Sequence, residues 1–150
     1  KIRFYVLILK LHKLGYFYMS ILSSKTLVDN ALKEIKTINT DEAVKLLEDN
    51  KCNLIDIRDV RELERDGKVE GSHHIPRGML EFWLDPQSSY FQEKKIGDMK
   101  NIVLYCALGF RSALATKALK EMGFTNVANA EGGFDSLKKA GLPIITKEKK

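Results

Sequence analysis

The stretch from Asn101 to Gly123, NIVLYCALGFRSALATKALKEMG, constrains the fold more than any other part of this 150-residue chain. Its first six residues are mostly apolar, which is typical of a buried strand. A short loop then leads into a helix predicted for Ser112–Met122, and Gly123 stands where glycine commonly terminates helices. A buried strand that runs directly into a helix is the unit from which parallel α/β sheets are built.

The rest of the chain repeats this alternation of short apolar segments and helices. Further helices are predicted for Thr26–Lys36, for DEAVKLLEDN with Thr40 as its N-cap, for DVRELERDG, for Gly78–Trp83 and for FDSLKKAG. Further short strands are predicted for Thr37–Asn39, for NLIDI (Asn53–Ile57), for SHHIP and for FTNVANA. We therefore expect an α/β fold with one domain, in which helices flank both faces of a central parallel sheet of about five strands.

The net charge of +5 is concentrated at the start of the chain. Residues 1–18 contain four basic and no acidic side chains, so the remaining 132 residues carry only +1. We therefore expect the folded part not to bind nucleic acid. The apolar run Phe4–Leu9 is too short for a signal peptide or a membrane span, so no membrane partner is expected, although an interfacial basic helix is an alternative. We interpret residues 1–19 as a leader or upstream extension, 20–146 as the domain and 147–150 as a basic tail.

The two cysteines, Cys52 and Cys106, and the three histidines limit the chemistry. Two widely separated thiols imply no disulfide framework, and reduced thiols indicate a cytoplasmic location. The cysteines and histidines show no ligand spacing such as CxxC or HxxxH, so no metal site is expected.

The loop CALGFR, Cys106–Arg111, carries the candidate nucleophile. It follows the carboxyl end of a predicted strand, where α/β sheets bind ligands. The N–H groups of such a loop and of a helix N-terminus form an anion-binding nest, and Gly109 permits its tight turn. Arg111 adds a permanent cation, and Ser112 can cap the helix or donate a hydrogen bond. We expect Cys106 to be a stabilised, nucleophilic thiolate; the alternative is an inert, buried cysteine.

Three segments, taken in order, resemble the motifs of a known family. They are LIDIRDVRELERDGKVEGSHHIPRG (Leu54–Gly78), YCALGFRSALA and NAEGGFDSLKKAGLPI. They resemble the Asp-x-Arg to Gly-x-x-His-Ile-Pro run, the active-site loop and the Gly-Gly-aromatic segment of rhodanese-like sulfurtransferases. The resemblance extends from about Ser24 to Ile144 and is closest to small single-domain members with the phrase IPRGMLEFWLDP. Leu137 departs from it, because many members carry tryptophan at that packing position.

The resemblance implies a sulfurtransferase in which Cys106 and Arg111 are catalytic. The thiolate takes the outer sulfur of a donor such as thiosulfate, sulfite leaves, and the persulfide passes its sulfur to cyanide or a thiol. Loop N–H groups stabilise the anionic persulfide, and neither a metal nor an organic cofactor is needed. The predicted substrate-binding residues are Ala107, Leu108, Gly109, Phe110, Ser112, Arg58 and Arg77.

Asp56, Glu62 and His74 are expected to support the site. Asp56 and Arg58 can form a pair that locks a loop, with Glu62 or nearby backbone as a further partner; for Arg58, donor binding is an equally open alternative. A preformed thiolate needs no general base, so His74 is expected to pack and to hydrogen-bond a loop. Cys52 is expected to be structural.

Loop length distinguishes two reactions. Arg111 follows Cys106 by five positions, whereas phosphatases with a cysteine loop have their arginine six positions after the cysteine. The shorter loop favours a sulfur atom over phosphate, so sulfur transfer is preferred to phosphatase or arsenate reductase activity. Two further interpretations stay open: a non-catalytic rhodanese-like binding or regulatory module, and a carrier that delivers sulfur to a protein partner.

Overall fold

The computed structural model describes residues 21–93 and 100–146, so the leader predicted for residues 1–19 and the tail at 147–150 lie outside the described residues. Within this part, the strands are β1 (Lys36–Ile38), β2 (Asn53–Asp56), β3 (Lys68–Val69), β4 (His73–His74), β5 (Ile102–Tyr105), β6 (Val127–Ala130) and β7 (Ile144–Ile145). The helices are α2 (Ser24–Glu34), α3 (Thr40–Glu48), α4 (Val60–Asp66), the 3₁₀ helix η1 (Arg77–Met79), α5 (Leu80–Leu84), α7 (Phe110–Glu121) and α8 (Gly133–Lys139).

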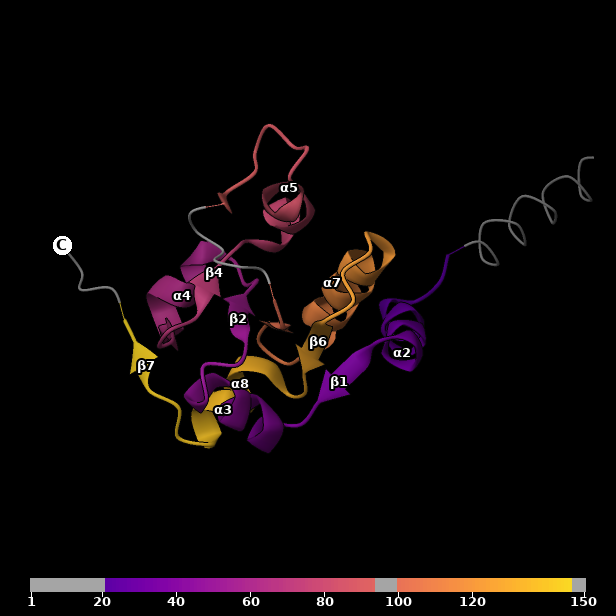
Figure 1. Cartoon of the computed structure of the whole chain (residues 1–150). Helices are drawn as coiled ribbons and strands as arrows, with labels where there is room; N and C mark the ends of the chain where they lie inside the picture. The colour runs from indigo at the N-terminus through magenta and orange to yellow at the C-terminus, as the bar shows by residue number, and fades with distance from the viewer. Residues whose placement is uncertain (1–20, 94–99, 147–150) are drawn as a thin grey trace, which may run out of the picture.

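Five strands form a central sheet in the order β1-β6-β5-β2-β4, and every neighbouring pair is parallel (Figure 1). The middle strand β5 pairs with β2 from Asn53↔Ile102 to Asp56↔Tyr105. This arrangement confirms the predicted α/β fold and its five-stranded parallel sheet. β3 and β7 form a separate antiparallel pair, which the sequence analysis did not predict.

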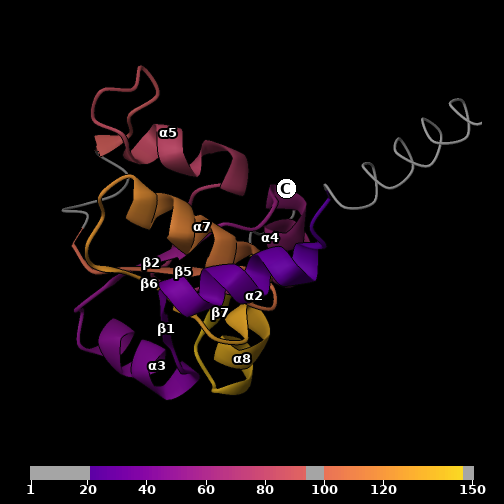
Figure 2. The ribbon, with the colours of Figure 1, turned by 90° about the vertical axis from the view of Figure 1, so that its right-hand side faces the viewer.

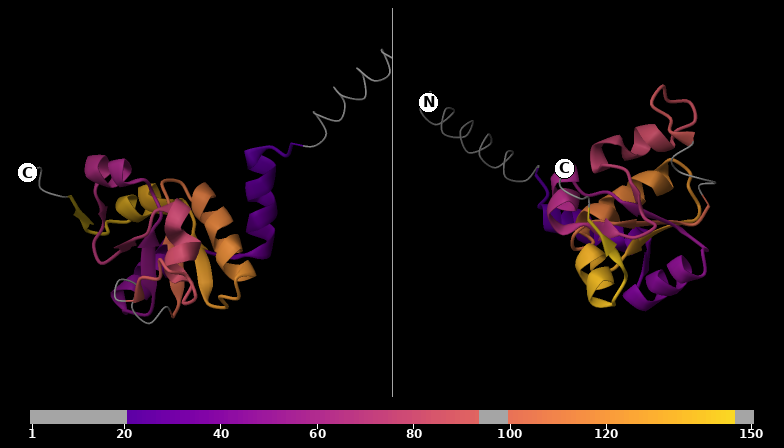
Figure 3. Two further views of the ribbon diagram at one scale, coloured as in Figure 1. Left: turned by 90° about the horizontal axis from the view of Figure 1, so that it is seen from above. Right: turned by 90° about the vertical axis from the view of Figure 1, so that its left-hand side faces the viewer.

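Helices cover both faces of the central sheet, as predicted (Figure 2). α5 and α7 lie over one face, where α2 packs against α7, and α3 and α8 lie over the other. Because successive strand residues point to opposite faces, Leu104 and Cys106 join the core that contains α7 residues, whereas Val103 and Tyr105 join the core that contains α8 residues. Figure 3 shows α2 at the β1 edge of the sheet.

Several helix starts differ from the prediction. The helix predicted for Thr26–Lys36 is α2, which begins two residues earlier, at Ser24, because Ser23 caps it by accepting from the Thr26 N–H. The N-cap of α3 is Asn39, whose side chain accepts a hydrogen bond from the Glu42 N–H at 2.9 Å, so the assignment of this role to Thr40 was wrong by one residue. Asparagine and threonine both cap helices, which is why the sequence alone did not separate them. α7 begins at Phe110, so Ser112 lies inside the helix and does not cap it.

The helices of the described residues are short. α7, with 12 residues, falls well below the roughly 20 residues that a membrane span needs. Across residues 21–93 and 100–146, none of the helices combines the length and apolar composition required to cross a bilayer.

Candidate active site

Cys106 lies directly after β5, at the carboxyl edge of the sheet, as predicted. Its side chain is buried, with 1% of its surface exposed. The Gly109 N–H donates to Cys106 Sγ at 3.2 Å, and Ser112 Oγ lies 3.5 Å from the same sulfur. Ser112 therefore fulfils the second of its two predicted roles, since it donates to the sulfur from within the first turn of α7.

These donors change the acidity of the thiol. Burial by itself raises the pKa of Cys106, because a charged group is less stable away from water. Hydrogen bonds from the hydroxyl and N–H of Ser112 and from the N–H groups of Leu108 and Gly109 outweigh burial, and they bring the pKa of Cys106 below its usual value. A thiolate at this position is thus stabilised by groups that the loop already holds in place, which favours the nucleophilic cysteine over the inert one.

The N-terminal turn of α8 binds the start of the loop through backbone hydrogen bonds. The Phe134 N–H donates to Cys106 O at 2.7 Å, and the Asp135 N–H donates to Ala107 O at 3.2 Å. The loop and the start of α8 approach each other closely because Gly133 has no side chain. A Cβ at this position would lie 2.4 Å from Cys106 O and 2.8 Å from Ala107 O. Gly133 also has a φ of +57°, which other residues rarely adopt.

Arg111 is bound to α4 by an ion pair with Glu62. Its two terminal nitrogens contact the two carboxylate oxygens at 2.7 and 2.8 Å, across 49 positions of sequence. Glu62 also accepts from the Asp59 N–H in the capping box of α4, so one carboxylate joins a helix start to the loop. The hydrogen bond from Arg111 lowers the pKa of Glu62, and the ion pair raises the pKa of Arg111, so both groups stay charged.

Arg58 is buried away from solvent, with 1% of its surface exposed. Its guanidinium pairs with Asp56 at 2.7 Å, donates to Gly67 O at 2.7 Å, and lies 3.8 Å from the centre of the Phe134 ring. Asp56 accepts from both the backbone and the side chain of Arg58. Of the two alternatives that the sequence left open for Arg58, this geometry favours the structural pair with Asp56.

The remaining predicted residues lie around these groups. His74 contacts Arg58 O through Nε2 at 2.9 Å, a loop-supporting hydrogen bond of the kind predicted. Arg77 donates its backbone N–H to Ile57 O, while its partly exposed side chain pairs with Glu81 at 2.6 Å. Leu108 and Phe110 are 52% and 58% exposed, so the loop presents two apolar side chains to solvent next to a buried sulfur.

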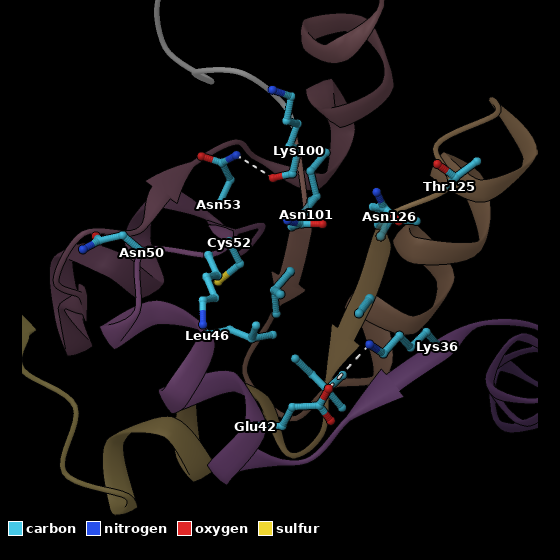
Figure 4. Close-up of a pocket in the computed structure, with 16 residues that line it drawn as sticks. Lys36, Glu42, Leu46, Asn50, Cys52, Asn53, Lys100, Asn101, Thr125 and Asn126 are labelled. Atoms are coloured by element: carbon cyan, nitrogen blue, oxygen red, sulfur yellow. Dashed lines mark hydrogen bonds and ion pairs between the residues drawn. The ribbon is translucent and has the colours of Figure 1, made fainter.

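Cys52 lies at the opposite edge of the sheet, immediately before β2. It lines a cavity that is formed at the amino ends of the strands (Figure 4). The strands β2 and β5 between the two cysteines are four residues long, or about 13 Å. Cys52 is therefore too far away to form a disulfide with Cys106 or to attack a persulfide on it. In residues 21–93 and 100–146, no group of three or more histidine, cysteine, aspartate or glutamate side chains could hold a metal ion.

Two contacts of the site were not expected from the sequence. Glu62 was expected to support the loop of Asp56 and Arg58, but its ion-pair partner is Arg111. The close approach of Gly133 to the Cys106 carbonyl was also missed. The Gly132–Gly133 pair was the one available signal, because adjacent glycines mark close backbone approach.

Comparison with known proteins agrees with the resemblance that the motifs predicted. The model of the rhodanese-like domain family matches residues 39–140. A mitochondrial protein of Schizosaccharomyces pombe, named provisionally as a thiosulfate sulfurtransferase, is 32% identical over 91 residues, covering 57% of this chain and 63% of that protein. The chain thus spans less than two thirds of that relative's length.

Two solved structures are similar over most of the chain. The polysulfide-sulfur transferase homodimer of Wolinella succinogenes has a TM-score of 0.63 and 33% identity, and the match covers 83% of this chain and 88% of that one. A protein of unknown function from Rhodopseudomonas palustris, described with tyrosine phosphatase as a possible activity, has a TM-score of 0.76 and 46% identity. That match covers 83% of this chain and 95% of that one.

Proposed function

Because this chain belongs to the family of rhodanese-like domains, we propose that it is a sulfurtransferase that carries sulfane sulfur as a persulfide on Cys106. The observation that carries the proposal is the cradle of donors around Cys106 Sγ, with the Gly109 N–H at 3.2 Å and Ser112 Oγ at 3.5 Å. We assign this activity to the unit of residues 20–146 and place it in the cytoplasm, where thiols stay reduced.

The reaction has two displacement steps. The Cys106 thiolate attacks the outer sulfur of a donor such as thiosulfate, a sulfur–sulfur bond forms, and the bond to the sulfonate sulfur breaks. Sulfite leaves with that electron pair, and the persulfide keeps one negative charge. A thiophilic acceptor, either cyanide or a thiol, then attacks the outer sulfur and releases the Cys106 thiolate. No electron is gained or lost overall, so the reaction needs neither a metal nor an organic cofactor.

The roles of the loop follow from charge. The N–H groups of Leu108, Gly109 and Ser112 are aimed at the sulfur before reaction, so they stabilise thiolate and persulfide without reorganisation. Arg111, held by Glu62, places a cation beside the loop and favours an anionic donor. Arg77 steers the donor from the start of η1, while Ala107 and Phe110 complete the wall of the donor site.

The nature of the acceptor separates two versions of this function. Leu108 and Phe110 together give the loop an apolar rim, which suits a protein surface as well as a small thiol. If the acceptor is a protein, the chain is a sulfur carrier: persulfide transfer to that protein is then fast, and turnover with thiosulfate and cyanide is slow. A non-catalytic binding module is the remaining alternative, and an intact Cys106 and Arg111 argue against it.

Phosphatase activity is the second candidate, because the similar protein of Rhodopseudomonas palustris is described with that possible activity. The loop argues against it. Five positions separate Cys106 from Arg111, one fewer than in phosphatases with a cysteine loop, so the loop offers less room for a phosphate group.

The test compares the two reactions on one preparation. Thiocyanate formation from thiosulfate and cyanide, and hydrolysis of p-nitrophenyl phosphate, are measured for the wild type and for Cys106→Ser. The proposal expects wild-type thiocyanate formation that Cys106→Ser abolishes, with no phosphate ester hydrolysis above background. Cysteine-dependent hydrolysis without sulfur transfer would replace the proposal with the phosphatase.

A further inference from the structure

We propose that helix α4 is a gate over Cys106, which opens by moving away from Arg111 into a cavity on its far side. The gate rests on the proposed function, in which a donor and then an acceptor must reach the sulfur of Cys106. Only 1% of the surface of this residue is exposed, so one of the elements around it must move. The contacts of each element indicate which one moves.

The reactive loop, α7 and the start of α8 are fixed in place. The N–H groups of Phe134 and Asp135 hold two carbonyls of the loop at 2.7 and 3.2 Å, and Gly133 leaves no free space between the two segments. The helix α7, which continues the loop, has five buried residues. Moving any of these parts would break several buried contacts at once, which is costly in a close-packed interior.

The helix α4 is held much less firmly. None of its seven residues, all of which the structure describes, is buried. Elements that bury few side chains open locally at a lower free-energy cost than the core does. Among the elements near the loop, α4 is therefore the one that moves most easily.

Both ends of α4 are anchored to Arg58, which itself is fixed by its buried pair with Asp56. Asp59, the N-cap of the helix, follows Arg58 in the chain. Gly67, the C-cap, accepts a hydrogen bond from the Arg58 guanidinium at 2.7 Å. Residues at the ends of elements commonly act as hinges. The helix can turn about these two ends while the chain stays attached to the core.

The ion pair of Glu62 with Arg111 is the latch that keeps α4 over the loop. The hydrogen bond from Arg111 to Glu62 is the main reason why the pKa of Arg111 is raised, and the charge of the Cys106 thiolate and a hydrogen bond to it add to this effect. The guanidinium thus lies between α4 and the sulfur. The side chains of Arg111 and Glu62 are 43% and 20% exposed, so water can replace this pair at a modest cost.

The cavity next to α4 has a volume of about 270 Å³. Val60, Leu63 and Glu64 line it from α4, and the strands β4 and β7 contribute His74 and Ile145. Figure 1 shows α4 beside these two strands. Val60 and Ile145 are 44% and 42% exposed, so their side chains border open space and belong to neither core.

The position of the cavity sets the direction of the movement. Glu62 is two positions from both Val60 and Glu64, which places it about 200° around the helix from each of them. The latch and the cavity therefore lie on opposite sides of α4. When α4 moves into the cavity, Glu62 is drawn away from Arg111, and the sulfur becomes accessible.

The first experiment measures alkylation of Cys106 by neutral iodoacetamide, at a pH at which the thiol is fully ionised, so that the rate reports access. Glu62→Gln weakens the latch and should make alkylation about fivefold faster. Glu64→Gln, on the cavity side of the same helix, should leave the rate unchanged. A wild-type rate in Glu62→Gln would overturn the gate. Because alkylation needs no sulfur transfer, this result is independent of whether the proposed function holds.

Amide hydrogen exchange identifies the element that moves. In Glu62→Gln, the N–H groups of α4 should exchange about fivefold faster, in step with alkylation of Cys106, because one opening exposes both. The N–H groups of α7 and α8 should keep their wild-type rates. Faster exchange in α7 or α8 would show that the whole site has loosened, and would contradict a gate at α4.

Filling the cavity should close the gate. Ile145→Phe adds volume on the strand side, and we expect α4 exchange and Cys106 alkylation both to become at least about threefold slower. Met122→Phe is the matched control, because Met122 is also 42% exposed but lies at the end of α7; it should change neither rate. If α4 exchange slows in Ile145→Phe while alkylation of Cys106 keeps its wild-type rate, α4 does not control access to the sulfur.

Discussion

The carboxyl and amino edges of the central sheet belong to the same strands, yet the pKa values of their two cysteines are shifted in opposite directions. Hydrogen bonds from Ser112, Leu108 and Gly109 outweigh burial and lower the pKa of Cys106. At the other end of the strands, burial alone raises the pKa of Cys52. The two thiols are both removed from solvent to some degree, so burial does not explain the difference; the aimed N–H and O–H donors do.

The two edges also show that the reactive thiol does not lie at the edge with the large cavity. The amino edge has a cavity of about 460 Å³ whose polar lining includes lysines and asparagines. At the carboxyl edge, Cys106 is enclosed by its own loop and by the first turn of α8. A reaction that moves one sulfur atom needs little space but needs its donors fixed in advance.

The substitution Gly133→Ala should have the largest effect, because it acts on the support of the reactive loop. The added methyl would lie 2.4 Å from Cys106 O at a φ of +57°. We expect a loss of about 3 kcal/mol or more in the free energy of unfolding, and a fall in turnover of more than about tenfold. Denaturant unfolding and thiocyanate formation measure the two effects.

Gly141→Ala is the matched control. Gly141 has a φ of +90°, but its added methyl would meet no atom within 4 Å. Its cost should be confined to backbone strain of about 1–2 kcal/mol, with turnover retained. If both variants lost equal stability and activity, close packing under the loop would not be what holds Cys106 in place.

Glu62→Gln should have the next largest effect, because it removes the charged partner of Arg111. The amide can still accept from the Asp59 N–H, so α4 should keep its capping box. We expect kcat/KM for thiosulfate to fall about tenfold, since Arg111 is no longer held beside the loop. Glu64→Gln, on the same helix, is the control and should not change kcat/KM. A wild-type value for Glu62→Gln would remove Glu62 from the positioning of Arg111.

Ser112→Ala sharpens the comparison of the two thiols directly. Losing the hydroxyl donor should raise the pKa of Cys106, so the thiolate fraction near pH 7 decreases and alkylation there slows several-fold. The difference should vanish at a pH above the pKa of both forms, where each thiol is fully ionised. Rates of alkylation against pH, read by peptide mapping, give the pKa of each thiol. The Cys52 profile should not move, and a joint shift would contradict a local effect of Ser112.

Arg77→Gln should have the smallest effect. Arg77 is partly exposed and paired with Glu81, so a steering role predicts a rise in KM for thiosulfate of about two- to fivefold, with kcat unchanged. The effect should shrink as salt is added. Arg65→Gln removes a similarly paired arginine from α4 and should leave KM alone. A fall in kcat with an unchanged KM would rule out steering.

Local patterns in the sequence predicted the elements that build the reactive edge. The apolar run before Cys106 and the helix after it correspond to β5 and α7, because a buried strand and a long helix have strong local signals. The helix start was wrong by two residues, since α7 begins at Phe110 and its N-cap, Gly109, has no side chain to mark the position. The placement of Cys106 at the carboxyl edge followed from strand direction alone.

Long-range contacts could not be predicted in the same way. β3 and β7 are two residues each, which is too short for any periodic signal, and they pair across the chain. The Glu62–Arg111 pair joins residues 49 positions apart, so it depends on α4 being folded back beside the loop. The lysines of the amino edge come from separate segments, and nothing local in the sequence relates them.

The central claim is that the donors around Cys106 hold a reactive thiolate that becomes a persulfide. Intact-protein mass after incubation with thiosulfate tests it most directly, in the wild type and in Cys106→Ser. We predict a gain of about 32 Da, one sulfur atom, in the wild type and no gain in Cys106→Ser. A wild type that gains no mass from thiosulfate or other sulfane donors, or a gain that persists in Cys106→Ser, would contradict the claim.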